Sequence, residues 1–311
     1  MNGLRKDLEE YLSIRRKLGF KLQRSGKLLH DFVLFAEKEG VSFITEELAL
    51  RWATQSKGCQ AAWSAARLGI VRGFAQYQSV IDPRTEIPSQ ELLPYRYYRR
   101  PPYIYSNDEV KRLIKTAQQL HSPLGLRAAT YSTVFGLLVV TGMRISEPIG
   151  LDRKDVDLIH GILTVYQTKF AKSRLVSIHP STQKALQKYE SLRGRIFPKP
   201  ETESFFISEQ GTRLTYWTVR STFVKLSRQI GLRGPHDSYG PRLHDFRHSF
   251  ATRTMLAWYR KGMNVDRHMP ELSAYLGHAR VSDTYWYLSA VPELMQLAAM
   301  RLEQIQKGRL Q

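Results

Sequence analysis

Helical periodicity runs through the first 80 residues of the chain. Hydrophobic residues recur there at intervals of three and four, the spacing of one face of an amphipathic helix. Four such faces can be followed, and their members are Leu4, Leu8, Tyr11, Leu12; Leu28, Leu29, Phe32, Phe35, Ala36; Leu48, Ala49, Trp52, Ala53; and Trp63, Ala66, Leu68, Ile70, Val71, Phe74. The pattern predicts a small all-helical domain over roughly residues 1–80.

The periodicity fails between residues 81 and 105. Prolines interrupt this stretch at positions 83, 88, 94, 101 and 102, which breaks any helix and predicts an inter-domain linker. Aromatic rings alternate with guanidinium groups within it, at Tyr95, Arg96, Tyr97, Tyr98, Arg99 and Arg100. Such a segment can follow a nucleic-acid backbone, with arginines on phosphates and tyrosines on sugars or bases. An ordinary solvated linker fits equally well.

A second domain is predicted to begin at a capping box. Ser106 and Glu109 have the spacing that satisfies the free N–H groups of a helix start. A strongly apolar helix then ends at Thr141 and Gly142, and two β-type runs, 162–168 and 174–178, predict a hairpin with a basic tip. A further strand is predicted at 204–208.

Helical patterns return in the last third of the chain. They cover residues 216–230, 246–259, 271–276, 281–288 and 292–304. The predicted fold class is mainly α with a small β-sheet. We expect a helical domain over 1–80, a linker over 81–105, a mixed α/β domain over 106–290, and a C-terminal helix and tail over 291–311.

The charge of the chain points to a polyanionic partner. The 311 residues include 47 Lys and Arg against 28 Asp and Glu, a net charge of +19. Residues 1–104 carry 17 basic and 11 acidic side chains, hence +6, and the remainder carries 30 and 17, hence +13. Both halves are therefore basic, as expected if each contacts nucleic acid. Ribosome-associated and other basic proteins share such a charge.

Other compositional features exclude several classes of protein. The single cysteine, Cys59, can form neither an internal disulfide nor a multi-cysteine zinc site. No apolar run approaches the roughly 20 residues that cross a bilayer, and the N-terminus lacks the apolar segment of a signal peptide. We therefore expect a cytoplasmic protein with no membrane partner.

Common cofactor motifs are missing from the sequence. It contains no phosphate-binding loop of the form GxxxxGK[ST], no GxGxxG after a strand and no HExxH pair. This favours chemistry without a metal ion or a nucleotide cofactor, although two-metal nucleases need only scattered carboxylates.

Six residues could together cleave a phosphodiester without a metal. That reaction needs bidentate cations on the phosphate, a nucleophile, a base and an acid for the leaving oxygen. The candidates are Arg144, Lys169, His244, Arg247, His278 and Tyr287. His244 and Arg247 are three residues apart and share a helical face, and Glu147 can orient Arg144 in the same way. Taken singly, each of these residues fits a purely structural role.

The motifs that carry these residues resemble those of the tyrosine recombinases, or phage-type integrases. They are TGMRISE at 141–147, QTKFAKSRLVSI at 167–178, HDFRHSFAT at 244–252, LGH at 276–278, and a tyrosine nine residues later, in the order of that family. The resemblance implies a helical core-binding domain and a mixed α/β catalytic domain that form a C-shaped clamp around DNA.

The resemblance also implies a role for each candidate. The two arginines would clamp the scissile phosphate, and His244 would accept a proton and donate a hydrogen bond there. Lys169 would protonate the leaving 5′ oxygen, and His278 would add a phosphate contact. Tyr287 would be the nucleophile, forming a 3′-phosphotyrosine without metal or ATP.

Some assignments have competitors. Tyr285 lies two residues from Tyr287, but the family interval favours Tyr287, and Lys172 competes with Lys169 at the hairpin tip. The 31 residues between Arg247 and His278 exceed the interval expected for the family. The residues expected to contact DNA outside the reaction centre are Tyr95, Arg96, Tyr97, Arg99, Arg100, Lys172 and Arg174.

The resemblance predicts a site-specific recombinase encoded by a mobile element. Its partner would be double-stranded DNA with short inverted core sites, so that it associates with the nucleoid. It would act as a homotetramer on synapsed DNA, alone or with other recombinases. The C-terminal helix would dock on a neighbouring protomer or fold back on its own domain. A type IB topoisomerase-like enzyme, an inactive DNA-binding member of the family and a metal-dependent transposase remain alternatives.

Overall fold

The computed structural model divides the chain into two compact units, Met1–Arg100 and Pro101–Gln311. The described residues are 3–56, 58, 61–94, 101–166, 173–199, 201–289 and 292–309.

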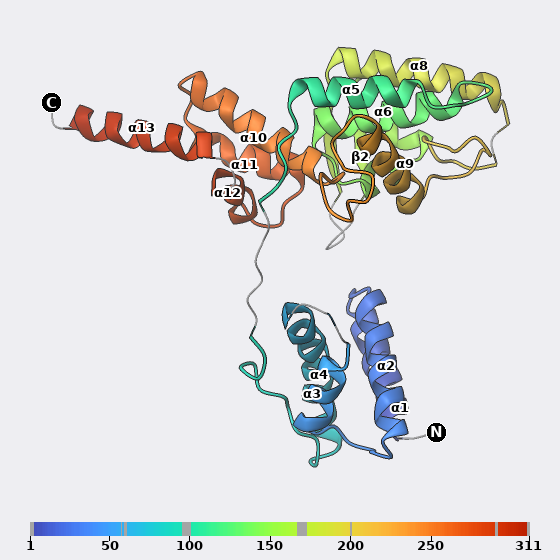
Figure 1. The fold of residues 1–311 in the computed structure, drawn as a ribbon, viewed down its shortest axis with the longest axis vertical. Coiled ribbons are helices and arrows are strands. Elements are labelled where there is room, and N and C mark those ends of the chain that lie inside the picture. The colour runs from blue at the N-terminus through green and yellow to red at the C-terminus, as the bar shows by residue number, and fades with distance from the viewer. Residues whose placement is uncertain are drawn as a thin grey trace. The chain divides into compact units, whose positions relative to one another are not determined.

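The described residues of the first unit form four helices and the turns between them (Figure 1). The helices are α1 (Gly3–Lys17), α2 (Gln23–Lys38), α3 (Glu46–Thr54) and α4 (Ala61–Ile81). Their apolar faces meet in one core, as the periodicity predicts, because burying these faces removes hydrocarbon from water.

Aromatic contacts organise this core. Phe32 of α2 and Trp52 of α3 meet edge to face with ring centroids 5.4 Å apart. The guanidinium of Arg67 lies 4.0 Å from the centroid of the Trp52 ring, a cation–π contact beneath the surface. The prediction of a helical first domain agrees with this packing.

The second unit begins with the predicted capping box. The Ser106 hydroxyl accepts from the Glu109 N–H at 3.1 Å, and the Glu109 carboxylate accepts from the Ser106 N–H at 2.7 Å. Helix α5 (Asn107–Gln118) follows, and α6 (Leu126–Thr141) ends where Gly142 takes a positive φ of 62°. Both helix ends are therefore set by local chemistry that the sequence displays.

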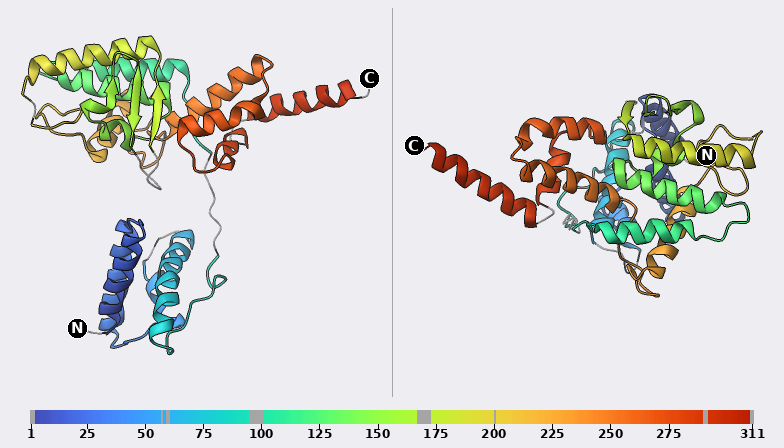
Figure 2. Two further views of the ribbon diagram at one scale, coloured as in Figure 1. Left: turned by 180° about the vertical axis from the view of Figure 1, so that it is seen from behind. Right: turned by 90° about the horizontal axis from the view of Figure 1, so that it is seen from above.

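Three short antiparallel strands lie side by side in the order β1-β2-β3 (Figure 2). After the short 3₁₀ turn η1 (Arg153–Asp155), they are β1 (Val156–Asp157), β2 (Ile162–Val165) and β3 (Arg174–Ser177). The hairpin of β2 and β3 agrees with the prediction, with Leu163 opposite Val176, and both side chains enter the core of the unit.

Two elements differ from the sequence-based expectation. Residues 204–208 form no strand: Ser204 and Ile207 make isolated bridges to Asp152 and Arg213. The apolar run that suggests a strand is buried in the core of the unit, and a buried apolar run looks the same in the sequence whether or not it forms a strand. Helix α8 (Pro180–Ile196) was not predicted, because few of its side chains are buried and its apolar stripe is narrow.

The remaining helices carry most of the motifs. They are α7 (Ser146–Gly150), α9 (Tyr216–Gln229), α10 (Asp245–Arg260), α11 (Val265–Leu276), α12 (Ser282–Ser289) and α13 (Pro292–Arg309). Helix α13 contacts α10 and α12 near its start, and its later turns run out from the second unit (Figure 1). Residues 258–270, where the sequence suggested an insertion, form the end of α10, a turn and the first part of α11.

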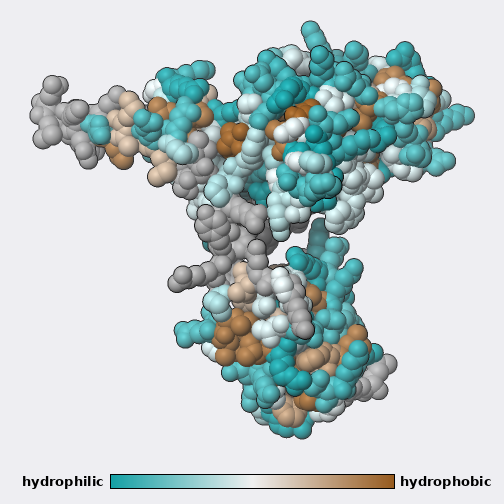
Figure 3. All heavy atoms as spheres, in the orientation of Figure 1, coloured by the Kyte–Doolittle hydropathy of each residue, from teal (hydrophilic) through white to brown (hydrophobic). Residues whose placement is uncertain are grey.

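Hydrophilic side chains cover most of the visible face of each unit (Figure 3). Large hydrophobic side chains are also exposed, among them Leu18, Val80 and Trp217. Within the described part of the chain, no helix has both the length and the apolar character needed to cross a membrane.

Candidate active site

Arg247 lies at the centre of the predicted site. Its side chain, in the first turn of α10, is almost fully buried at 1% exposure. Nη1 donates to the carbonyl of Gly142 at 3.0 Å, and Nη2 donates to the carbonyl of Leu276 at 2.7 Å. One guanidinium thus joins three of the sequence motifs, those at 141–147, 244–252 and 276–278.

Two glycines allow these motifs to approach each other. Gly142 has a φ of 62° and Gly277 a φ of 69°, a conformation that favours glycine. A Cβ on Gly142 would lie 2.7 Å from the Phe250 ring, and one on Gly277 would lie 2.8 Å from the Arg174 guanidinium. The backbone at both positions therefore needs glycine for its angle and for its size.

Arg144 is held from two directions at the rim of the site. Its Nη1 donates to the Glu147 carboxylate at 3.2 Å, and its Nη2 donates to the carbonyl of Gly277 at 3.2 Å. The backbone N–H of Arg144 also donates to Glu147, at 2.8 Å. About a third of the Arg144 side chain remains exposed. These bonds to Glu147 fix one side of Arg144 and leave part of its side chain accessible.

Glu147 has a second and stronger partner in Arg174 of β3. The two guanidinium nitrogens of Arg174 donate to the two carboxylate oxygens at 2.9 and 2.8 Å, and its Nε donates to the carbonyl of Tyr275 at 2.9 Å. Burial favours the neutral form of Glu147, but the hydrogen bonds and charge of Arg174, with those of Arg144, lower the pKa of the carboxyl below its usual value. Arg174 was expected as a DNA contact, and its guanidinium is instead bound to protein groups.

His244 immediately precedes α10, and His248 lies one turn later, in the first turn of that helix. Their rings meet edge to face with centroids 4.7 Å apart. His248 is buried and also contacts the rings of Trp286 at 5.1 Å and Tyr287 at 5.3 Å. His248 received no role from the sequence, yet it lies between the predicted base and the predicted nucleophile. Its place in HDFRHSF, four residues after His244, was the feature that could have indicated this.

His278 follows α11 and faces α12. Its ring stacks on that of Tyr287, with centroids 6.0 Å apart and planes at 23°. Its Nδ1 lies 2.6 Å from the hydroxyl of Thr284, a residue that the sequence reasoning did not select.

Tyr287 and Tyr285 have clearly different surroundings. Tyr287 is 3% exposed and contacts His248, His278 and Trp286. Tyr287 also lies close enough to Arg247 to raise the pKa of that guanidinium. Tyr285 is 39% exposed and donates to Asp266 at 3.1 Å. Only Tyr287 of the two therefore lies among the predicted site residues.

The electrostatics of the site keep His244 and His278 neutral. His244 is exposed as a whole residue, but desolvation of its ring by the surrounding protein and the charge of Arg247 lower its pKa to about 4. Burial and the charges of Arg247 and Arg144 lower the pKa of His278 to about 4 as well. Burial lowers the pKa of Arg247 to about 10, partly offset by Tyr287, so this guanidinium remains charged at neutral pH.

The structure thus brings together five of the six predicted catalytic residues, and Glu147 with them. The sixth, Lys169, lies outside the described residues, as do its competitor Lys172 and the linker segment 95–100. Among the described residues, no group of three His, Cys, Asp or Glu side chains could hold a metal ion.

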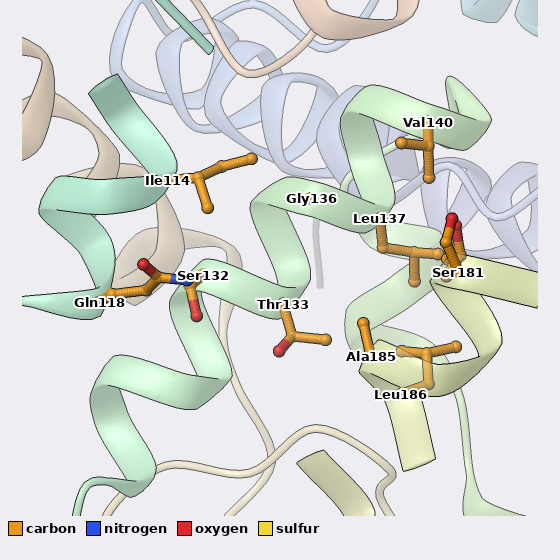
Figure 4. A pocket seen from close by; sticks show the side chains of 11 residues that line it. Ile114, Gln118, Ser132, Thr133, Gly136, Leu137, Val140, Ser181, Ala185 and Leu186 are labelled. Atoms are coloured by element: carbon orange, nitrogen blue, oxygen red, sulfur yellow. The ribbon is translucent and has the colours of Figure 1, made fainter. Parts of the chain in front are cut away.

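A pocket of about 250 Å³ lies elsewhere in the second unit, between α5, α6 and α8 (Figure 4). Ile114, Leu137 and Leu186 supply apolar walls, and Ser132 and Thr133 add hydroxyl groups. None of the predicted site residues lines it, so the site described above is separate from this pocket.

Comparison with known proteins gives the family of the chain. Residues 104–293 match the model of the phage integrase family. The "Putative integrase/recombinase y4rB" of Sinorhizobium fredii is 45% identical over 307 residues, covering 97% of this chain and 98% of that protein. A tyrosine recombinase XerC of Pelotomaculum thermopropionicum is 29% identical over 252 residues, covering 78% of this chain and 75% of that protein.

Solved structures support the same fold. The XerH recombinase bound to a palindromic difH substrate superposes with a TM-score of 0.64 at 19% identity, covering 90% of this chain and 78% of that one. The lambda integrase tetramer bound to a Holliday junction gives 0.58 at 18% identity, covering 89% and 77%. The chain belongs to the phage integrase family of tyrosine recombinases, and its mainly helical fold with a small sheet agrees with the prediction.

Proposed function

We propose that this protein breaks and rejoins DNA at specific sites through a covalent 3′-phosphotyrosine, without a metal ion or ATP. The observation that carries the proposal is the convergence of Arg144, His244, Arg247, His278 and Tyr287 around one site. Membership of the tyrosine recombinase family supports the same chemistry.

The reaction begins with attack of the Tyr287 hydroxyl oxygen on the scissile phosphorus. The phenolic proton passes to His244, whose lowered pKa leaves it neutral at neutral pH and able to accept. A bond forms between the tyrosine oxygen and phosphorus, and the bond to the 5′ oxygen breaks. Lys169 donates the proton that this oxygen takes up, which gives a 5′ hydroxyl and a 3′-phosphotyrosine. Attack by another 5′ hydroxyl reverses these steps and reseals the strand.

Arg247 and Arg144 stabilise the phosphate as negative charge develops on its oxygens. The guanidinium of Arg247 is bound to two carbonyls, so its orientation is already set before substrate enters. Arg144 presents the exposed part of its side chain to the same phosphate. Because both guanidinium groups are already oriented, they need not reorient as the charge develops, whereas water molecules in their place would have to.

Binding to DNA rests on the basic charge of both halves of the chain. We propose double-stranded DNA with short inverted sites as the substrate, with the linker arginines and the hairpin tip as backbone contacts. Helix α13 exposes Met295, Met300 and Leu302, and these side chains supply a surface for a neighbouring protomer in a tetramer. A mobile element is the proposed source, in keeping with relatives named as integrases.

The test compares Tyr287→Phe with Tyr285→Phe. The binding site is first selected by the protein from the inverted repeats in the DNA that flanks its gene. The substrate is a nicked suicide duplex that carries this site. Tyr287→Phe should bind this duplex normally and form no covalent complex, because the attacking oxygen is missing. Tyr285→Phe, whose hydroxyl faces Asp266, should cleave as wild type does.

Other outcomes would redirect the proposal. Covalent capture by Tyr287→Phe would refute the nucleophile assignment. Wild-type protein that binds the duplex without ever cleaving it would indicate an inactive family member. Relaxation of any supercoiled plasmid, with or without the inverted repeats, would indicate topoisomerase-like activity, and loss of cleavage in a chelator would indicate a metal-dependent reaction.

A further inference from the structure

His278 is neutral at neutral pH, so its imidazole ring carries a single proton. Burial and two nearby arginines lower its pKa to about 4. A neutral imidazole donates from one nitrogen and accepts at the other. Whether His278 can donate a hydrogen bond to a phosphate therefore depends on which nitrogen holds the proton.

Thr284 contacts Nδ1, the ring nitrogen of His278 that faces α12. It lies in the first turn of α12, is fully buried, and its hydroxyl oxygen is 2.6 Å from Nδ1 of His278. Among the described residues, this is the one side-chain hydrogen bond of Thr284. Its backbone N–H makes a separate hydrogen bond, to the carbonyl of Val281 at 2.8 Å.

Two arrangements of this hydrogen bond are possible, and they differ in their cost. If Nδ1 carries the proton, the Thr284 hydroxyl only accepts, and its own hydrogen is buried without an acceptor among the described residues. If the hydroxyl donates to a bare Nδ1, both groups are satisfied. A buried donor without a partner loses its hydration uncompensated, so the second arrangement is favoured.

A hydrogen bond from Thr284 to a bare Nδ1 also leaves Nε2 of His278 protonated and able to donate. Nε2 of His278 has no hydrogen-bond partner among the described residues, and the residue is only partly buried. With Nδ1 bare, Nε2 carries the proton and can donate to a phosphate oxygen. The opposite tautomer would direct a lone pair at an anion, which is repulsive.

We propose that Thr284 is a positioning residue that holds His278 in the Nε2–H tautomer, ready to donate to the scissile phosphate. The inference rests on the proposed function, in which His278 contacts that phosphate. Thr284 precedes Tyr287 by three residues, so both lie on one face of α12. The helix that carries the nucleophile therefore also sets the donor, and docking of α12 prepares both together.

The tautomer can be measured directly in the full-length protein. Long-range ¹H–¹⁵N NMR distinguishes protonated from bare ring nitrogens, and the spectrum of His278→Gln assigns the His278 signals. At pH 7 we expect Nε2 protonated and Nδ1 bare in the wild type. A protonated Nδ1 would overturn the inference without any Thr284 variant, and this result does not depend on cleavage.

Cleavage of the suicide duplex provides the second test. Thr284→Val keeps the shape but removes the hydroxyl, and we expect about tenfold slower covalent complex formation at unchanged DNA affinity. Thr284→Ser should restore most of the rate, because it restores the donor. The matched control is Thr252→Val, at a fully buried threonine whose hydroxyl has no hydrogen-bond partner among the described residues, and its rate should stay at the wild-type level.

The outcomes separate this inference from the proposed function. A wild-type rate for Thr284→Val would overturn the positioning role, provided that His278→Gln is slow. If His278→Gln also cleaves at the wild-type rate, the phosphate contact of His278 is wrong. A Thr284→Ser variant as slow as Thr284→Val would overturn the role of the hydroxyl, because the smaller side chain retains that group.

Discussion

Replacing Glu147 by glutamine removes the negative charge from a carboxylate whose side chain has no exposed surface. Two guanidinium groups then lose their anionic partner: Arg174, whose side chain is 15% exposed, and Arg144, which is 35% exposed. An amide of the same size keeps one acceptor oxygen but turns an N–H₂ group toward another donor. Glu147→Gln should therefore destabilise the second unit strongly, with little change in volume.

The size of the effect follows from the burial of the pair. Removing one partner of a buried ion pair lowers the free energy of unfolding by about 3–5 kcal/mol. Because glutamine keeps one acceptor oxygen, we expect a loss at the lower end, about 3 kcal/mol. For a unit of this size, about 2–4 °C of melting temperature is lost per kcal/mol. The expected fall in the melting temperature of the second unit is therefore roughly 6–12 °C.

Differential scanning calorimetry of the full-length protein measures this shift. The control is Glu190→Gln, which removes an exposed carboxylate 3.8 Å from Arg153 and should change stability by less than about 1 kcal/mol. The sign of the pH dependence is also defined. The pKa of Glu147 is lowered from its usual 4.5, so the carboxylate stabilises the fold above that value and loses this contribution as the pH falls through the lowered pKa. Equal melting of Glu147→Gln and wild type at pH 7 would refute the reasoning.

Two further predictions concern the histidines and the turn at Gly142. Because the pKa values of His244 and His278 are lowered to about 4, single-turnover cleavage should hold steady from pH 7 to 5.5 and fall only on approach to pH 4; a loss centred near pH 6.5 would contradict this. Gly142→Ala should cost at least about 1–2 kcal/mol, because of its positive φ and its overlap with the Phe250 ring. In thermal melting, Gly136→Ala is the control, since its Cβ would meet no atom within 4 Å, and an equal loss there would contradict the steric argument.

Local patterns were the part of the fold that the sequence predicted well. The apolar faces of the first unit, the Ser106 capping box and the end of α6 at Gly142 all depend on residues within a turn or two of each other. Helix α8 was missed because its buried side chains are few and include Arg193, which hydropathy counts as polar. The run at 204–208 was misread because a buried apolar stretch has the same appearance whether or not a strand lies beside it.

The site shows the same division between local and long-range information. Motif order identified the predicted catalytic residues, but the partners of Arg247 are backbone carbonyls at Gly142 and Leu276, which no side-chain pattern reveals. Arg174 is predicted to contact DNA as a basic residue of the hairpin motif at 167–178. Its pairing with Glu147 spans 27 positions along the chain and becomes evident only when β3 and α7 are placed together.

The three arginines of the site differ in how far their hydrogen-bond partners neutralise their positive charge. Arg174 is bound bidentately to Glu147, so the two charges largely cancel. Arg247 is bound to neutral carbonyls and retains its full positive charge, and Arg144 shares only part of Glu147 while donating to the carbonyl of Gly277. His244 and His278 are neutral and add no charge. Among the described residues, the site therefore holds close to two uncompensated positive charges. In the proposed reaction the negative charge of the phosphodiester rises from one toward two as the phosphorus becomes pentavalent, so these charges would favour the transition state over the bound substrate.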